Sequence, residues 1–531
     1  MSLRGNIAKS RAGGPPFRLD PSRILVEVDS ESNLTAIAES ARRTMDDLDV
    51  DTQRVGYVER TLSDIGFKTD RLDEFGVVVA SANRVADVVE NIRKARDTFR
   101  ESSIEELEAV KDKALNRGNR TILGGFRSGD FGESNVPATK LEASLRNELS
   151  DIQLHNPLTK AVNDIDGVFN AEISYTRNTP GPRNLGVDPS SKPDITEKNK
   201  EEFENLPDLG NVIDRMGVRG SWSTTRGENV VVAVFDTSFC KDYFDESRIM
   251  DTFSGDDVES AFSAPEEGHG TMTAYTAAGN KEESPVDYNG IAPDADLLLA
   301  RLSDSDGALS NTEQAWNWLS SKIKQIDKPV ISNHSYGVPL CSAKTMNLCE
   351  STSAKLARVM NQRDDHQGFY AAGNAGIYCG HRLSGLTNGI NGINSDPSSI
   401  TVGALRFDTN EAQLYSSHGY GTCADSDTDP KPDVSSMIPT VVPYGCKLKD
   451  MSSRSGGSSA GTSEASPIVC GVGALVASVT GSAETEEIQD ALESTATLPR
   501  RTQVNIINGY DARFGKGQVR AGEAISKVTS E

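Results

Sequence analysis

The chain has 531 residues, with 78 acidic and 55 basic side chains and a formal net charge of −23. Its length exceeds that of one typical domain and predicts at least two folded units. The acidic balance argues against nucleic-acid and anionic-membrane partners, because both bind to basic patches. The N-terminus lacks the apolar core of a signal peptide, and no segment is long enough to span a bilayer. We therefore expect a cytoplasmic protein, with secretion by another route left open.

Regular strand and helix patterns begin near residue 23. Residues 1–22 are polar and contain a Gly-Gly-Pro-Pro run, which predicts a disordered tail. Apolar periodicity then predicts a small α+β domain over residues 23–175. Its expected elements are strands over 24–28 and 75–80 and helices over 33–47, 82–94, 103–114 and 140–153. A stretch rich in proline and charge over 176–206 predicts a linker.

The region 207–531 reads as a second, larger domain. Short apolar strands alternate there with helical patterns, which predicts an α/β fold with a mainly parallel sheet flanked by helices. The expected strands cover 231–236, 297–302, 330–333, 369–372 and 400–403, and the expected helices include 208–220 and 312–324.

One stretch in this domain points to chemistry. A run rich in glycine and serine leads into Gly461, Thr462 and Ser463, and an apolar run continues to about residue 481. This pattern predicts a buried helix that starts near Ser463, with Pro467 in its first turn. A helix N-terminus favours developing negative charge, so Ser463 is the candidate nucleophile.

A serine needs a base to take its proton, and two residues suit that chemistry. His269 lies in a Gly-His-Gly-Thr motif ahead of a helical pattern, and Asp236 ends a buried strand. A carboxylate in that place can orient and stabilise a histidine. The segments VVVAVFDTS, GHGTMTA, SYG, AAGN and GTSEASP, in this order, resemble the subtilisin-like serine proteases, the subtilases.

The resemblance covers roughly residues 209–527 and implies a subtilisin-like fold with an Asp236-His269-Ser463 triad. It also implies that Asn374 stabilises the oxyanion, and that the 23–175 domain resembles the ferredoxin-like prodomain of the family. In subtilases, the segments that line the first substrate pocket match Ser335, Tyr336, Gly337, Ala371, Ala372 and Gly373. Small residues leave an open slot there, which predicts a broad preference for a large or apolar side chain.

Three positions depart from the family pattern. Ser238 replaces the glycine of the common Asp-Thr-Gly motif, so a glycine-only backbone angle is in question there. Met272 stands where a second histidine is frequent. Glu464 follows the nucleophile where methionine is usual, and an anion at that place is expected to raise the pKa of His269.

The chemistry requires no cofactor, and the metal sites stay unknown. Calcium remains open, because acidic residues alternate over 425–429 and recur at Asp304 and Asp306, although a solvated acidic loop is the favoured interpretation. Cys379 and His381 are close, but no second pair at metal spacing supports zinc. The 7 scattered cysteines predict small buried thiols, with Cys341 and Cys349 able to pair if the protein is exported.

These observations predict a serine endopeptidase that acts on proteins or peptides and is made as a zymogen, with its own N-terminal domain as chaperone and inhibitor. One alternative is an intracellular protease whose retained N-terminal domain binds a regulatory protein partner. A remote alternative is a catalytically inactive binding protein on the same scaffold.

Overall fold

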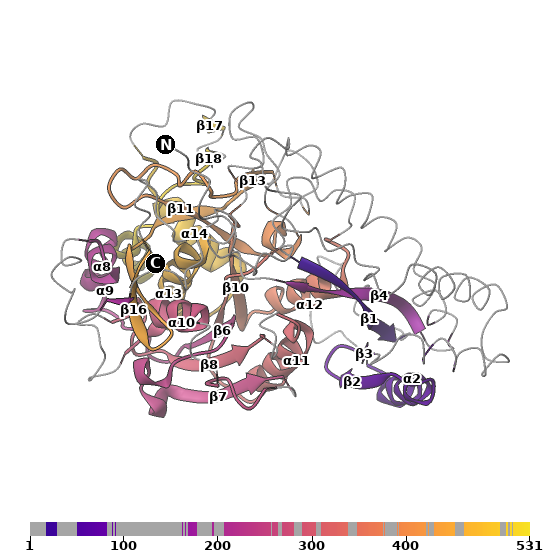
Figure 1. Cartoon of the computed structure of the whole chain (residues 1–531). Helices are drawn as coiled ribbons and strands as arrows, with labels where there is room; N and C mark the ends of the chain where they lie inside the picture. Colours follow the sequence, from indigo (N-terminus) through magenta and orange to yellow (C-terminus); the bar gives the residue numbers. More distant parts are fainter. Residues whose placement is uncertain are drawn as a thin grey trace, which may run out of the picture. The chain divides into compact units, whose positions relative to one another are not determined.

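In the computed structural model the chain forms two compact units, one mainly of residues up to Thr176 and the other mainly of Arg177–Glu531 (Figure 1). Each unit is described by itself. The residues that the structure describes are 17–28, 50–81, 88, 91, 162, 165, 168–177, 194–195, 206–255, 258–263, 268–280, 289–303, 309–337, 348–374, 376, 390, 392–420, 423, 430–451, 461–499, 506–507, 510–511 and 513–530.

The N-terminal unit contains a four-stranded sheet in the order β2-β3-β1-β4. Its described elements are β1 (Phe17–Val28), α2 (Thr52–Asp64), β2 (Lys68–Leu72), β3 (Val77–Ser81) and β4 (Val168–Arg177). β1 and β3 pair antiparallel, and their central side chains are buried. In the strand order, β1 also neighbours β4, so the first and last strands of the unit lie side by side, as expected for a ferredoxin-like arrangement.

Several expectations for this unit need correction. β1 begins at Phe17, inside the predicted disordered tail over 1–22, because its strand pattern extends across Pro21. α2 and β2 were not predicted, although Asp51 caps α2 by accepting hydrogen bonds from two backbone N–H groups. The helices predicted over 33–47, 103–114 and 140–153, and most of that over 82–94, lie outside the described residues.

The C-terminal unit is built on a seven-stranded parallel sheet in the order β14-β11-β10-β9-β6-β8-β7. This confirms the predicted α/β class. The strands are β6 (Val231–Asp236), β7 (Ile249–Ser254), β8 (Asp296–Arg301), β9 (Val330–His334), β10 (His366–Ala371), β11 (Ile400–Leu405) and β14 (Val434–Met437). Six of the seven are almost wholly buried, as strands covered on both faces must be.

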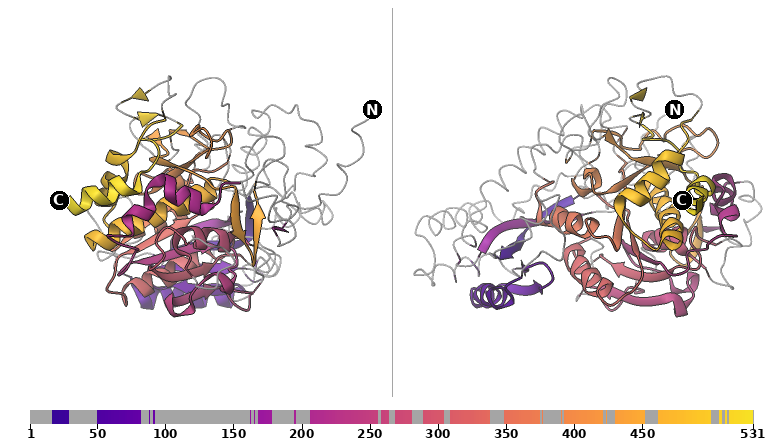
Figure 2. Two further views of the ribbon diagram at one scale, coloured as in Figure 1. Left: turned by 90° about the vertical axis from the view of Figure 1, so that its left-hand side faces the viewer. Right: turned by 180° about the vertical axis from the view of Figure 1, so that it is seen from behind.

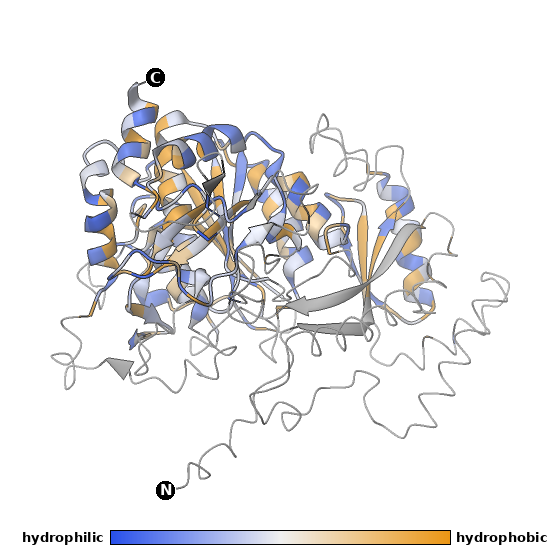
Figure 3. Ribbon diagram, turned by 90° about the horizontal axis from the view of Figure 1, so that it is seen from above, coloured by the Kyte–Doolittle hydropathy of each residue, from blue (hydrophilic) through white to orange (hydrophobic). Residues whose placement is uncertain are grey.

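Helices cover both faces of this sheet (Figure 2). α10 (His269–Ala278) and α13 (Thr462–Thr480) pack against each other and on one face. α11 (Thr312–Ile323) and α12 (Thr352–Asn361) pack together on the other. Figure 3 shows the hydrophobic residues gathered along the enclosed strands. Among the described helices, only α13 is long and apolar enough to span a bilayer, and it is almost entirely buried in this core.

Smaller elements complete the C-terminal unit. They are α8 (Leu209–Met216), α9 (Val218–Ser221), the hairpin β15 (Val441–Tyr444) and β16 (Lys447–Asp450), α14 (Thr485–Thr495) and α15 (Ala521–Ser530). β5 (Asp194–Ile195) pairs antiparallel with β16. Part of the stretch predicted as a linker is thus a strand of this unit.

Among the described residues, two disulfides join cysteines that are distant in the sequence, contrary to the expectation of free buried thiols. Cys240 pairs with Cys446, and Cys349 pairs with Cys423 rather than with Cys341, while Cys470 is a buried free thiol. The pairs lie 206 and 74 residues apart, so no local spacing could indicate them.

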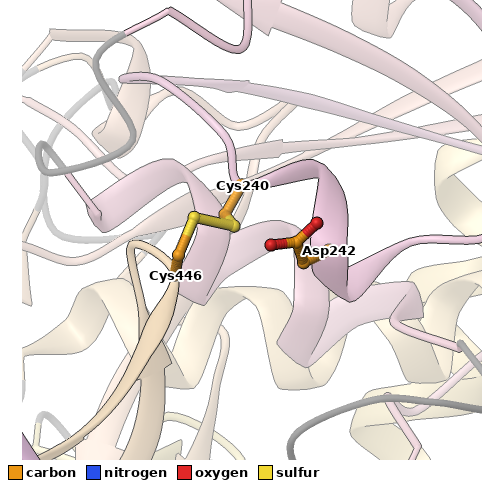
Figure 4. A group of neighbouring side chains, drawn as sticks. All are labelled: Cys240, Asp242 and Cys446. Carbon is orange, nitrogen blue, oxygen red and sulfur yellow. A yellow bond between two sulfur atoms is a disulfide. The ribbon is translucent and has the colours of Figure 1, made fainter.

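The first disulfide also decides how a small cluster of metal-type ligands is read. Figure 4 shows Asp242 beside the bonded sulfurs of Cys240 and Cys446. A thiolate is the form of cysteine that binds a metal, and both sulfurs are used in the covalent bond. Within the described part of the chain, this cluster is therefore a cross-link that ties the segment after β6 to the turn between β15 and β16.

We expect replacement of both Cys240 and Cys446 by serine to lower the free energy of unfolding by about 2–5 kcal/mol, because the bond closes a long loop in the unfolded chain. Urea titration of wild type and variant checks this, with the reduced wild type as a second sample. A second variant, Cys349→Ser/Cys423→Ser, measures the loss in unfolding free energy when the other disulfide is removed. The losses measured for the two variants should add up to the loss in the reduced wild type. Equal midpoints for all samples would contradict the cross-link.

α13 also depends on glycine for its approach to the sheet. A Cβ on Gly473 would lie 2.4 Å from the ring of Phe369 in β10. We expect Gly473→Ala to lower the free energy of unfolding by about 1–3 kcal/mol through overpacking. Gly220→Ala is the matched control, since nothing lies within 4 Å of its added Cβ, and it should be neutral or slightly stabilising. Equal thermal midpoints for the two variants would contradict the close approach.

Candidate active site

Asp236 and His269 are joined directly. Asp236 is the last residue of β6 and fully buried, and its Oδ1 lies 2.7 Å from His269 Nδ1. The same carboxylate accepts hydrogen bonds from the Thr237 backbone N–H at 2.7 Å and from the Thr273 hydroxyl at 3.2 Å. Because a carboxylate can only accept, Nδ1 carries the proton and His269 Nε2 is left as an acceptor. This is the tautomer that a general base requires.

The loop around His269 leaves no room for larger side chains. A Cβ on Gly270 would lie 2.7 Å from the carbonyl oxygens of both Thr237 and Ser238. Gly268 has a φ of +57°, and a Cβ there would meet the Tyr444 ring at 2.2 Å. Gly270 thus lets the first turn of α10 approach the residues that follow β6, and Gly268 lets the start of the helix approach Tyr444 at the end of β15.

Ser238 causes no strain in place of the family's glycine. Its φ is not positive, since the positive-φ non-glycine residues in the described segments are Asn229 and Asn410. The Ser238 hydroxyl donates to the carbonyl of Ala261 at 3.0 Å. The doubt raised by this substitution is therefore removed, and the hydroxyl adds a tie between the loop and its neighbour.

Ser463 lies at the start of α13, as predicted, and is held by Ser335. The Ser463 hydroxyl donates to the Ser335 carbonyl at 3.2 Å, and the Ser335 hydroxyl donates to the Ser463 carbonyl at 3.1 Å. Pro467 is the sixth residue of α13, in its second turn rather than the first as predicted. Proline has no N–H, so the Ser463 carbonyl lacks its usual helical donor four residues on, and Ser335 supplies one.

The two halves of the candidate site sit at one edge of the sheet. β6 and β9 are neighbours, and Phe235 pairs with His334. Asp236 and Ser335 each follow that pair by one residue, so the carboxyl ends of adjacent strands bring them side by side. His269 Nε2 is buried without a hydrogen-bond partner in the structure, and the Ser463 hydroxyl bonds to Ser335 instead.

Asn374 is fixed by the residue before the candidate nucleophile. Its Oδ1 accepts hydrogen bonds from the Thr462 backbone N–H at 3.0 Å and the Thr462 hydroxyl at 3.1 Å. That hydroxyl also accepts from the Gly373 N–H at 2.9 Å. With Oδ1 occupied, the Asn374 amide nitrogen is turned toward Gly461, where a Cβ would approach it to 2.6 Å.

A residue missed by the sequence analysis joins the two segments predicted to bind substrate. Asn394, nearly buried in a 3₁₀ turn (Gly392–Ser395), donates from Nδ2 to the carbonyls of Tyr336 and Ala371, both at 2.8 Å. Its partners are 58 and 23 residues away, so no sequence pattern indicates this role. The predicted segments 335–337 and 371–373 are thus held together by one side chain.

Glu464 differs from its expected anionic role. Its carboxyl group is fully buried, and no partner lies in hydrogen-bond geometry to either oxygen. Burial raises its pKa well above the usual range, although the nearby Gly461 backbone N–H lowers it. Burial also raises the pKa of Tyr415, and the Tyr415 hydroxyl is without a hydrogen-bond partner too. Glu464 is therefore neutral, and the expected anion beside His269 is absent. Met272 is simply a buried core residue.

The acidic run over 425–429 and the residues Asp304, Asp306, Cys379 and His381 lie outside the described residues.

We expect Glu464→Met to raise the free energy of unfolding by about 1–3 kcal/mol, because it removes a buried carboxyl without partners. A raised carboxyl pKa means that the folded state binds more protons than the unfolded one above about pH 4.3. The contribution of this carboxyl group to the stability of wild type therefore falls as pH rises beyond that value. The difference in unfolding free energy between Glu464→Met and wild type should grow over the same range. Urea titrations at pH 4 and pH 8 check this, and an equal advantage at both pH values would contradict it.

Three comparisons place these features among known proteins. A model of the subtilase family matches residues 227–517. The chain is 33% identical over 115 residues to the intracellular serine protease of Paenibacillus polymyxa, covering 21% of this chain and 34% of that protein. It is 23% identical over 347 residues to the subtilisin-like protease PopC of Myxococcus xanthus strain DK1622, covering 60% of this chain and 63% of that one.

The crystal structure of fervidolysin from Fervidobacterium pennivorans, a keratinolytic enzyme related to subtilisin, superposes with a TM-score of 0.51 at 17% identity. That match covers 97% of this chain and 62% of the other, which supports the subtilisin-like fold. The chain thus spans less than two thirds of the length of each of these proteins. Because the family match extends over more than half of its residues, the chain belongs to the subtilase family of serine proteases.

Proposed function

We propose that the protein is a serine endopeptidase with Ser463 as nucleophile, His269 as general base and then acid, and Asp236 as the group that orients His269. The observation that carries the proposal is the buried 2.7 Å contact between Asp236 and His269 at the sheet edge where Ser463 is also held. Family membership supports the same reaction class.

The first step is the attack of the Ser463 hydroxyl on a peptide carbonyl. A rotation of that hydroxyl from the Ser335 carbonyl toward His269 Nε2 would let the imidazole take its proton. The imidazolium formed is stabilised by Asp236 and then protonates the leaving amine. Water repeats the sequence on the acyl-enzyme and frees the serine.

The oxyanion formed in each attack needs donors already in place. The Asn374 amide nitrogen is one candidate, since its oxygen is taken up by Thr462. The Ser463 backbone N–H at the start of α13 is the other, because the first N–H groups of a helix have no partner within it. Neither donor requires a cofactor. Calcium binding stays a proposal, and any calcium would stabilise the fold rather than take part in the reaction.

Substrate is proposed to bind extended along the segments 335–337 and 371–373, which Asn394 joins. Backbone pairing of this kind lets an enzyme accept chains of varied sequence. The preference for a large or apolar residue before the cleaved bond remains a prediction.

The N-terminal unit is proposed to be an inhibitory and folding domain that is removed by self-cleavage. Its sheet order β2-β3-β1-β4 supports the ferredoxin-like resemblance. The alternative, a retained domain that binds a regulatory protein, makes the opposite prediction for cleavage.

Cellular location is a separate question on which two observations differ. A relative named an intracellular serine protease supports a cytoplasmic site of action. The pairs Cys240–Cys446 and Cys349–Cys423 favour an oxidising compartment. Counting free thiols in protein taken from its native host separates the two.

The decisive experiment compares wild type, Ser463→Ala and Ser478→Ala. Ser478 lies in the same helix, where its hydroxyl donates to the Glu228 carbonyl, and serves as the matched control. We expect wild type and Ser478→Ala to hydrolyse casein and react with a fluorophosphonate, and Ser463→Ala to lose about 10⁶-fold in rate and all labelling. Labelling that persists in Ser463→Ala would overturn the assignment.

Intact mass spectra of the same three proteins test the zymogen. Cleavage between residues 176 and 206 in all but Ser463→Ala supports self-maturation. Labelled but uncut wild type supports the retained regulatory domain, and wild type that is neither labelled nor active supports the inactive binding protein.

A further inference from the structure

Strand β9 and the two residues after it carry five polar side chains in a row, all buried. They are Ser332, Asn333, His334, Ser335 and Tyr336. Side chains alternate between the faces of a strand, so Asn333 and Ser335 face one layer of helices while the other three face the opposite layer. Such a run in a buried parallel strand needs hydrogen bonds on both faces.

On the first face, the side chains hold the nucleophile helix. Asn333 Nδ2 donates to the Ser335 hydroxyl at 3.0 Å, and that hydroxyl donates to the Ser463 carbonyl. Ser466, one turn further along α13, donates to Asn333 Oδ1 at 2.8 Å. The position of Ser463 is therefore tied to this strand.

On the opposite face, four hydrogen bonds run in a line, which we name the histidine chain. Tyr336 Oη lies 2.8 Å from His334 Nδ1, and His334 Nε2 lies 2.8 Å from Ser332 Oγ. Ser332 Oγ lies 2.9 Å from His366 Nε2, and His366 Nδ1 lies 3.2 Å from the Met360 carbonyl.

The direction of every bond in the histidine chain follows from its last member. The Met360 carbonyl can only accept, so His366 Nδ1 carries a proton and His366 Nε2 accepts from the Ser332 hydroxyl. The Ser332 oxygen then accepts from His334 Nε2–H. His334 Nδ1 is left as an acceptor, and it accepts a hydrogen bond from the Tyr336 hydroxyl. All four bonds are satisfied with both imidazoles neutral.

The surroundings hold the His334 ring in place and keep the His366 ring uncharged. His334 is stacked between Trp316 and Tyr370, with ring centroids 4.7 and 4.6 Å away. Burial lowers the pKa of His366 to about 4, although the nearby Asp365 raises it and Arg363 lowers it further. A charged His366 would give the Ser332 oxygen a second N–H donor and leave the Ser332 proton without its acceptor, so neutrality preserves the direction.

We propose that the histidine chain is a positioning device that sets the substrate-binding segment 335–337 relative to Ser463, with Ser332, His334 and His366 as positioning residues that do not touch substrate. The same strand anchors Ser463 on one face and Tyr336 on the other. This inference rests on the proposed function, because Tyr336 is a substrate-binding residue only if the protein is a peptidase.

The test compares Ser332→Ala with Ser320→Ala as the matched control. Ser320 is equally buried in α11, and its hydroxyl has no partner. With a peptide anilide that carries phenylalanine before the cleaved bond, we expect Ser332→Ala to raise KM about tenfold while kcat changes less than about threefold. Fluorophosphonate labelling, which needs only the triad, should be unchanged. If Ser332→Ala is active and its KM equals that of Ser320→Ala, this inference is overturned while the proposed function stands.

A second variant tests whether the effect travels along the chain. Tyr336→Phe removes only the hydroxyl at the other end and keeps the ring. If both act through one chain, the double variant should show the KM of either single variant, whereas multiplied effects would overturn the coupling. Histidine ¹⁵N spectra at pH 7 should show His366 protonated on Nδ1 and His334 on Nε2, and the reverse would overturn the chain. A wild type without labelling or hydrolysis would overturn the proposed function and this inference together.

Discussion

The hydrogen bonding between parallel strands β6 and β9 is the constraint on which the candidate site depends. It aligns Phe235 with His334, and so it places Asp236 and Ser335 at the same edge of the sheet. Each of these residues then holds one half of the candidate site, since Asp236 contacts His269 and Ser335 contacts Ser463. A shift of either strand by one residue would turn the side chains of that strand to the opposite face and separate the two halves of the candidate site.

Close packing of backbones makes the rest of the arrangement possible. Gly270 lets α10 approach the end of β6, and Gly473 lets α13 lie against the ring of Phe369. Pro467 adds a different effect, because it leaves the Ser463 carbonyl open to the Ser335 hydroxyl. The small residues that dominate α13 therefore serve the position of the serine as well as the core.

The sequence was informative where chemistry demands a residue type and a local pattern. Asp236 after an apolar strand, His269 between glycines and Ser463 before a helix could all be predicted as candidates, and the parallel α/β class followed from strand and helix periodicity. Asn394 could not, because its partners are brought to it only by the fold. The pairing of Cys240 with Cys446 escaped prediction for the same reason.

Burial also determines which groups near Ser463 carry charge. Glu464 follows Ser463 directly. Its carboxyl group stays protonated because burial removes the water that would stabilise the charged form. His366 lies at the far end of the histidine chain and is neutral because desolvation opposes its protonation. In a low-dielectric interior, a charge on Glu464 would act on the adjacent Ser463 more strongly than it would in water. In the proposed mechanism, these neutral groups leave the proton transfer to His269 and its partner Asp236, while hydrogen bonds that need no charge set the geometry around them.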